Sequence, residues 1–205
     1  MRNVVGELQA RTVLDATPVA LEVVPGKSAL GVGAEDGSLV LLSFTGSAVN
    51  VSARLTASSA AVTHLAVDST AKFCLVVTAD RRLSVFALFP SPTLAGFLPL
   101  PAAGSVSSLT VTAFPDGTVK FAVAQMAEEG PGGTLVTGVL PKSLDASRPT
   151  KTPLEFTPNE LTLQQATLKE TPGAVCITSE SLLAVFSADQ DNINLYDWNI
   201  STRSC

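Results

Sequence analysis

The chain has 205 residues and a net charge of −5, and hydrophobic residues make up 46% of it against only 15% charged residues. Lys and Arg form no cluster beyond the pair Arg81–Arg82, which argues against a direct nucleic-acid partner because phosphate backbones are bound by groups of basic side chains. A chain this apolar is expected to bury its secondary structure on two faces rather than one.

The first predicted elements are short, β-branched apolar runs separated by Gly, Pro, Asp and Ser, a pattern typical of strands and tight turns. The strands expected in this first unit are residues 18–24, 28–34, 38–44 and 50–55. One further strand is expected upstream, at residues 4–14, where it would be an outer strand that closes a ring.

The same succession of strand, turn, strand, turn and strand recurs in residues 62–88, 106–140 and 175–198. The first three units start about 43 and 44 residues apart, which matches the spacing of about 40–45 residues of four-stranded propeller blades. A polar, proline-bearing insertion at residues 143–160 makes the next interval longer.

These intervals predict an all-β fold, a β-propeller of four-stranded antiparallel blades with about four blades present in one domain. The expected blades are residues 17–56, 60–101, 104–169 and 173–198. A β-sandwich also uses many short strands and stays an alternative, but it gives no reason for the regular intervals.

The turn and third strand of these units resemble the WD-repeat pattern Asp-Gly-Thr-Ile-x-Leu-Trp-Asp. Residues 36–43 read Asp-Gly-Ser-Leu-Val-Leu-Leu-Ser, and residues 193–197 read Ile-Asn-Leu-Tyr-Asp, with Tyr in place of Trp. The Gly-His dipeptide of the family is absent from every unit, so its buried Asp–His network is not expected. The chain thus resembles a divergent WD-repeat-like β-propeller. Because rings of that family commonly have seven blades, the resemblance implies that further residues or a partner chain complete the ring.

Two sets of residues are expected to stabilise such blades. Turn acids accept backbone N–H bonds and turn glycines permit positive φ; the expected turn residues are Asp36, Gly37, Asp80, Asp116, Gly117 and Asp191. An aromatic side chain near the end of the third strand packs between neighbouring blades; the expected packing aromatics are Phe44, Phe86, Tyr196 and Trp198.

No catalytic, cofactor-binding or metal-binding residue is expected. His64 is the only histidine, and the chain has no Gly-x-Ser-x-Gly nucleophile motif. Residues 25–28 read Pro-Gly-Lys-Ser but lack the preceding glycine of a phosphate-binding loop. The acids at 128–129 and 189–191 fall in predicted turns, where solvated carboxylates are common.

The three cysteines, Cys74, Cys176 and Cys205, stand far apart, which suits a reducing compartment better than a disulfide framework or a zinc site. The central part of the longest uncharged stretch, residues 83–115, carries four prolines and predicts no transmembrane segment. The N-terminus lacks the apolar run of a signal peptide. We therefore expect a cytoplasmic protein. If the protein associates with a membrane, we expect it on the cytosolic face.

The repeat and the absence of a catalytic constellation favour a non-catalytic scaffold that binds other proteins, or a subunit of a larger assembly. An alternative is a regulator of a small Sar-type GTPase at the endoplasmic reticulum, namely its exchange factor. The layout of this chain, with a long insertion after the third unit, is similar to that of the propeller of this exchange factor. A propeller hydrolase is disfavoured because clustered His and acidic ligands are missing.

Overall fold

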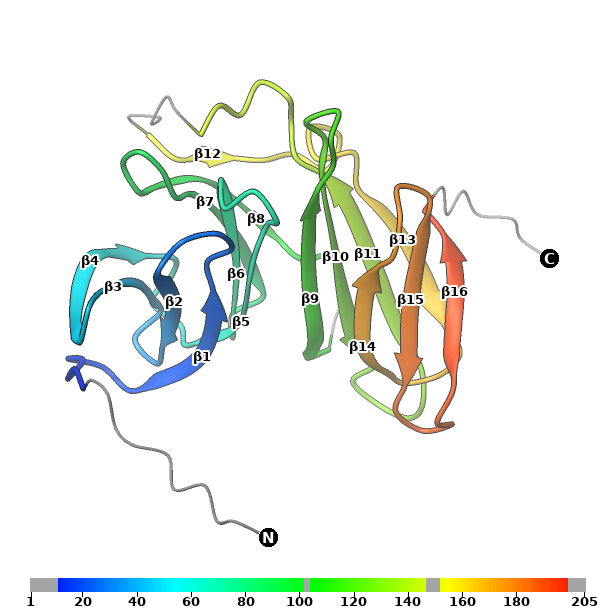
Figure 1. Cartoon of the computed structure of the whole chain (residues 1–205). Coiled ribbons are helices and arrows are strands. Elements are labelled where there is room, and N and C mark those ends of the chain that lie inside the picture. Colours follow the sequence, from blue (N-terminus) through cyan, green and yellow to red (C-terminus); the bar gives the residue numbers. More distant parts are fainter. Residues whose placement is uncertain (1–10, 102–103, 147–151, 199–205) are drawn as a thin grey trace, which may run out of the picture.

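A computed structural model describes residues 11–101, 104–146 and 152–198 (Figure 1), and these residues form strands and connecting turns without a helix. The strands are β1 (Pro18–Val23), β2 (Ala29–Ala34), β3 (Ser38–Thr45), β4 (Ala48–Thr56), β5 (Val62–Val67), β6 (Phe73–Thr78), β7 (Arg82–Ala87), β8 (Thr93–Pro99), β9 (Val106–Ala113), β10 (Val119–Met126), β11 (Gly133–Val139), β12 (Leu154–Glu155), β13 (Gln164–Leu168), β14 (Pro172–Ile177), β15 (Leu182–Ser187) and β16 (Ile193–Asp197). The all-β fold class expected from the sequence is confirmed.

The strands form four sheets, and apart from β12 each sheet is built from strands that follow one another along the chain. The orders are β1-β2-β3-β4, β12-β8-β7-β6-β5, β13-β11-β10-β9 and β14-β15-β16. All neighbours pair antiparallel except β12, which runs parallel to β8. Short hairpin turns explain this order, because antiparallel neighbours can be joined by a few residues whereas parallel ones cannot.

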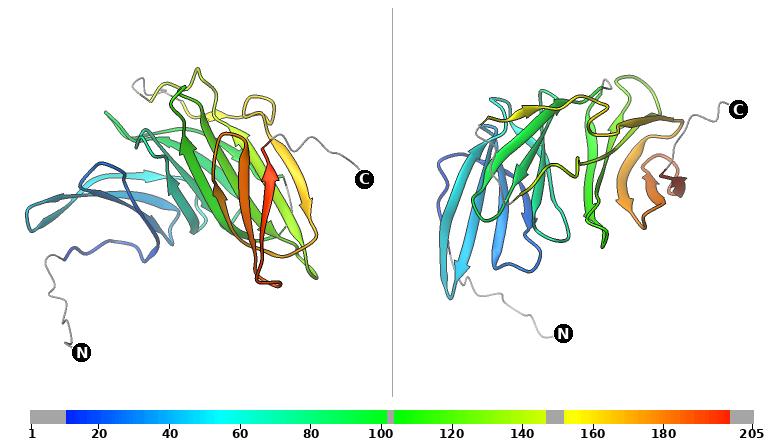
Figure 2. Two further views of the ribbon diagram at one scale, coloured as in Figure 1. Left: turned by 45° about the vertical axis from the view of Figure 1, so that its right-hand side comes forward. Right: turned by 90° about the horizontal axis from the view of Figure 1, so that it is seen from above.

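The sheets stand side by side in chain order (Figures 1 and 2), and the first strand of each sheet lies next to the first strand of the following one. Thus β1 contacts β5, β5 contacts β9 and β9 contacts β14. The middle strands of the second and third sheets, such as β6 and β10, are buried on both faces because these sheets lie between two neighbours, which helps to account for the high hydrophobic content.

Three apolar clusters fill the spaces between successive sheets. Phe86 lies in the cluster between the first and second sheets, and Phe121 in the cluster between the second and third. Trp198 and the half-buried Tyr196 pack between the third and fourth sheets. The side chain of Lys120 adds to this last junction, since its ammonium lies 4.7 Å from the centre of the Trp198 ring.

Phe44 departs from the packing role expected of it. Its side chain is 36% exposed at the end of β3. The residues of β3 that alternate with it, Leu39 and Leu41, pack toward the second sheet, so Phe44 points to the opposite side. No other sheet of the described residues covers that side, which is why Phe44 packs between no two sheets.

Two other expected segments fall partly outside the described residues. Of the strand expected at 4–14, residues 4–10 are not described, and residues 11–14 form no strand although Leu14 packs on the outer side of the first sheet. Within the insertion, residues 147–151 are not described, but Leu154 and Glu155 form β12. The insertion therefore supplies a strand as well as loops.

In the part of the chain that the structure describes, no helix is long and apolar enough to cross a membrane.

Candidate interaction surface

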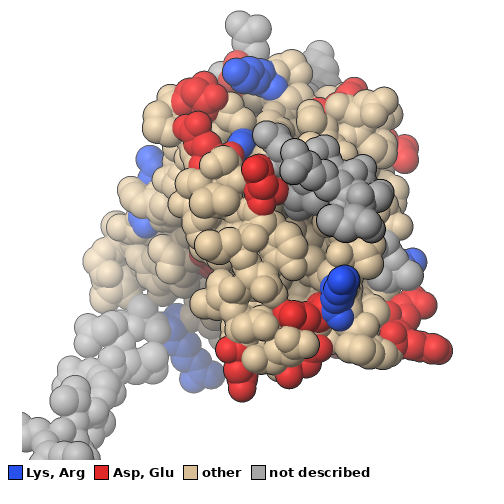
Figure 3. All heavy atoms as spheres, turned by 90° about the vertical axis from the view of Figure 1, so that its right-hand side faces the viewer, with Lys and Arg blue, Asp and Glu red and all other residues tan. Residues whose placement is uncertain are grey.

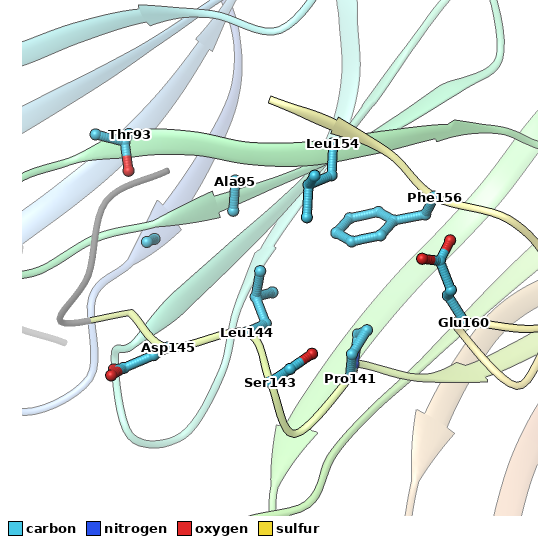
Figure 4. A pocket seen from close by; sticks show the side chains of 10 residues that line it. Thr93, Ala95, Pro141, Ser143, Leu144, Asp145, Leu154, Phe156 and Glu160 are labelled. Carbon is cyan, nitrogen blue, oxygen red and sulfur yellow. The ribbon is translucent and has the colours of Figure 1, made fainter. Parts of the chain in front are cut away.

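The insertion covers the outer strand of the second sheet and encloses a pocket of about 580 Å³ with it. Figure 4 shows Thr93 and Ala95 of β8 on one side and Leu144, Leu154 and Phe156 of the insertion on the other. The pocket is therefore built by two segments that lie far apart in sequence.

Phe156 is the residue that attaches the insertion to the sheet. Its ring is almost fully buried, and its backbone N–H donates to the carbonyl oxygen of Phe97 at 2.8 Å. Gly96 makes this possible, because a Cβ at that position would lie 2.5 Å from the ring. The turn that follows is fixed by Glu160, which accepts hydrogen bonds from the backbone N–H and the hydroxyl of Thr157.

A groove of about 1000 Å³ lies beside this pocket, at the end of the sheets where the β5–β6, β7–β8 and β9–β10 turns meet. Phe89 and Phe114 line it, together with charges of both signs on Lys72, Lys142 and Asp116. Phe89 is partly exposed and has the ammonium group of Lys27 5.2 Å from its ring centre.

The pocket and the groove share the side chains of Pro141, Leu144 and Asp145. We call this continuous area the insertion surface. It combines apolar side chains, aromatic rings and a few charges of both signs, which is the chemistry of sites that bind segments of other proteins.

The predicted turn residues lie at the ends of hairpins. Asp36 accepts hydrogen bonds from the backbone N–H and the hydroxyl of Ser38, at 3.1 and 2.6 Å, and Asp116 accepts the same pair from Thr118. Gly37 and Gly117 follow these acids with φ of +79° and +82°, a region that residues with a side chain rarely adopt. These hydrogen bonds lower the pKa of both carboxyls.

Asp80 connects two sheets. Its carboxylate accepts the hydroxyl of Ser58, at 2.6 Å, and that of Thr78, and Ser58 lies in the segment that leads from the first sheet to the second. Burial opposes ionisation of Asp80, but these hydrogen bonds outweigh it and lower its pKa.

In the fourth sheet, Asp189 holds the position that corresponds to Asp80. It accepts hydrogen bonds from the hydroxyl of Ser187 and the backbone N–H of Thr171, which lower its pKa. Asp191, which the sequence singled out, lies in the same turn at a positive φ of 51°. The sequence order Thr78-x-Asp80 and Ser187-x-Asp189 could have distinguished the two acids.

Sequence reasoning also missed Asp68, which lies in the turn between β5 and β6. It is fully buried and accepts hydrogen bonds from the backbone N–H groups of Thr70 and Phe73. The signal was present, because Asp68-Ser-Thr70 repeats the spacing of Asp36-Gly-Ser38 and Asp116-Gly-Thr118.

His64 lies on β5, away from the insertion surface. Burial lowers the pKa of its imidazole, and a hydrogen bond with the backbone of Ser107 opposes this effect. Among the described residues, no group of three or more His, Cys, Asp or Glu side chains is arranged to hold a metal ion.

By sequence, no family model matches the chain, and no curated protein does. Among solved structures, the chain is similar to the β-propeller domain of Cps50 (Swd1) from Myceliophteria thermophila, with a TM-score of 0.59 and 16% identity over 88% of this chain and 54% of the other. It is also similar to the C-terminal WD40 domain of Sif2, with a TM-score of 0.60 and 17% identity over 91% of this chain and 47% of the other. The chain thus spans about half the length of these two propellers.

One of the two structures is a β-propeller domain and the other a WD40 domain, and this chain matches both over most of its length. The chain therefore has the fold of a divergent WD-repeat-like β-propeller.

Proposed function

We propose that the chain is a non-catalytic interaction module that binds a segment of another protein at the insertion surface. The observation that carries the proposal is the continuity of the pocket and the groove, which share Pro141, Leu144 and Asp145. A connected apolar depression with scattered charges suits an extended peptide, whose side chains occupy pockets while its charged groups meet both signs of charge.

The fold supports this function, since WD40 propellers usually mediate protein interactions. A cytoplasmic location belongs to the same proposal: the two described cysteines, Cys74 and Cys176, are free thiols, as is usual in a reducing compartment. The exchange-factor alternative rests on the long insertion, which lies between β11 and β13 of the third sheet, and no second feature of the described residues supports it.

The test is selection of binding peptides from a displayed random library, followed by measurement of their dissociation constants by fluorescence polarisation. Leu154 and Phe89 are partly exposed at the two parts of the surface, so Leu154→Asp and Phe89→Asp should each weaken binding at least about tenfold by placing a charge in an apolar contact.

A matched control is Leu195→Asp, which changes an exposed leucine on the fourth sheet, away from the insertion surface. We expect its affinity for the selected peptides to equal that of the unchanged chain. Peptides that lose affinity with Leu195→Asp but not with Leu154→Asp or Phe89→Asp would show that the insertion surface is not the binding site.

A further inference from the structure

The last sheet has an apolar face that no other described part of the chain covers. Two rows of paired residues cross it, namely Ala174–Phe186–Ile193 and Cys176–Ala184–Leu195. Ile193 and Leu195 are 68% and 66% exposed. Figure 3 shows the side of the molecule on which this sheet lies: most of it is uncharged, and acidic side chains gather toward its lower edge.

The first sheet has a second apolar face of this kind, on the opposite side of the row of sheets. Its two rows are Leu21–Val32–Val40 and Val23–Leu30–Leu42. The inner parts of these rows are covered by their neighbours and by Leu14, but Leu21 and Val23 on β1 are 65% and 60% exposed.

The junctions inside the molecule show what such faces pack against. Where the second sheet meets the first, β5 presents the large side chains of Val62 and Leu65 to the glycines Gly33 and Gly31 of β2. The approach is so close that a Cβ on Gly33 would lie 2.3 Å from Cγ1 of Val62.

The other two junctions repeat this direction. Leu109 and Val111 of β9 pack in one cluster with the small Ala66 of β5. Val175 of β14 lies against β9, where its backbone N–H donates to the hydroxyl of Ser108 at 3.1 Å. At each junction the first strand of the following sheet gives large aliphatic side chains, whereas the first strand of the preceding sheet gives small or polar ones, such as Ala20, Ala66 and Ser108. Later strands of the preceding sheet also give large side chains, among them Leu39 and Leu41 of β3.

The two uncovered faces fit this rule as partners of each other. β14 presents small side chains, Ala174 and Cys176, as a preceding sheet does, and β1 presents large ones, Val19, Leu21 and Val23, as a following sheet does. When one surface of a chain binds a different surface of an identical chain, the copies form a closed ring if the rotation that relates them brings the last copy back to the first.

We propose that two copies of this chain form one closed ring, with the last sheet of each copy packed on the first sheet of the other. The complementarity of the two faces supports this occupant, because β1 carries the large side chains and β14 the small ones that the first strands at the inner junctions combine. The inference concerns faces separate from the insertion surface and does not depend on the proposed function.

The first measurement is the mass of the 205-residue chain by analytical ultracentrifugation over a range of concentrations. We expect a discrete species of two chains. Leu21→Asp and Leu195→Asp should each raise the dimer dissociation constant at least about tenfold, because each introduces a charge into both junctions. Leu154→Asp, an exposed leucine of the insertion, should leave the dimer unchanged.

Mixing the two variants tests the direction of the contact. A pair made of one Leu21→Asp copy and one Leu195→Asp copy has one unaltered junction, because the unchanged last sheet of the first meets the unchanged first sheet of the second. The mixture should therefore form more dimer than either variant alone. A contact between two like faces would instead be broken by only one of the substitutions, with no rescue on mixing.

Cross-linking places the two faces directly against each other. In a Cys205→Ser chain carrying Leu21→Cys, a short bismaleimide should join the introduced thiol on β1 of one copy to Cys176 of the other, giving a covalent dimer when two differently tagged copies are mixed. A chain that stays monomeric at every concentration would overturn the proposal, and the two faces would then be available to sheets of another protein. A ladder of larger aggregates would also overturn it, as would a dimer that neither face substitution weakens.

Discussion

At the scale of single residues, the hairpin turns rest on short-range hydrogen bonds and on the backbone freedom of glycine. Asp36 and Asp116 each bind the N–H and hydroxyl two residues ahead, and a glycine with positive φ lies between donor and acceptor. Gly37 has a second constraint, since a Cβ there would lie 2.2 Å from the carbonyl oxygen of Ser58.

Replacing Gly37 by alanine should therefore cost more stability than the same change at Gly117. Gly117 has a similar φ but open space around it, so Gly117→Ala should cost only the strain of a left-handed residue, about 1 kcal/mol. Gly37→Ala adds a collision with backbone and should cost about 3 kcal/mol. Urea unfolding of the two variants measures the difference, and equal midpoints would show that the Ser58 contact is not a constraint.

The turn carboxylates also predict how stability depends on pH. The pKa values of Asp36, Asp80, Asp116 and Asp189 are lowered in the folded chain. Because a lowered pKa means that the folded state favours the charged form, their contribution is present above the unfolded value of about 3.9 and is lost as the pH falls through the folded values. Glu22, whose pKa burial raises, works in the opposite direction.

The free energy of unfolding should therefore fall as the pH is lowered from about 4 toward about 2, measured as urea midpoints at constant ionic strength. Asp189→Asn removes one of the four carboxylates and should make this decline shallower. A variant with an unchanged decline would show that its turn carboxylate does not couple folding to protonation.

At the scale of elements, the junctions between sheets hold the molecule together, and the two aromatics at the ends of third strands differ in what they contribute. Phe86 is fully buried between the first and second sheets, whereas Phe44 is exposed on the outer side of the first. We expect Phe86→Ala to destabilise the chain by about 3–5 kcal/mol because it leaves a cavity.

Phe44→Ala is the matched control and should cost less than about 1 kcal/mol. Thermal unfolding followed by circular dichroism compares the two. A large loss with Phe44→Ala would contradict the exposed position of this ring.

The insertion is attached to the second sheet through β12 and Phe156, and this attachment can be tested separately from the sheets. In Gly96→Val, the new side chain would occupy the space of the Phe156 ring, so the insertion should detach. Limited proteolysis should then cut faster within residues 143–160, which are expected to be the most sensitive internal segment.

Cleavage within β6 and β7 should stay slow in both chains, because these strands are buried on both faces. Early cleavage there would mean that Gly96 supports the sheet itself and not only the insertion.

At the scale of the whole molecule, four sheets in a row bury three junctions and leave two apolar faces at the ends. Phe186, Ile193 and Leu195 on one face, and Leu21 and Val23 on the other, account for part of the apolar surface that a chain with 15% charged residues must carry. Apolar faces of this size mark sites of association, which is why the closed ring of two copies is the arrangement to test.

The sequence by itself determined the all-β fold class and most of the strands and turns, but not β12 in the insertion. Alternating apolar residues and Asp-Gly turns act over a few residues, and the regular intervals repeat the same local unit, so neighbouring strands had one short way to pair. The same local rule also covers Asp68 and Asp189, whose carboxylates accept hydrogen bonds within their turns in the same way.

Only the tertiary structure decided which of the similar positions became buried and where a site formed. Phe44 and Phe86 occupy comparable places in their strands, but a neighbouring sheet covers only Phe86. The insertion surface depends on Phe156 meeting Gly96 and on Leu144 lying between pocket and groove. These contacts join segments far apart in the chain, and their energy comes from close packing of particular side chains, which no pattern within a single segment encodes.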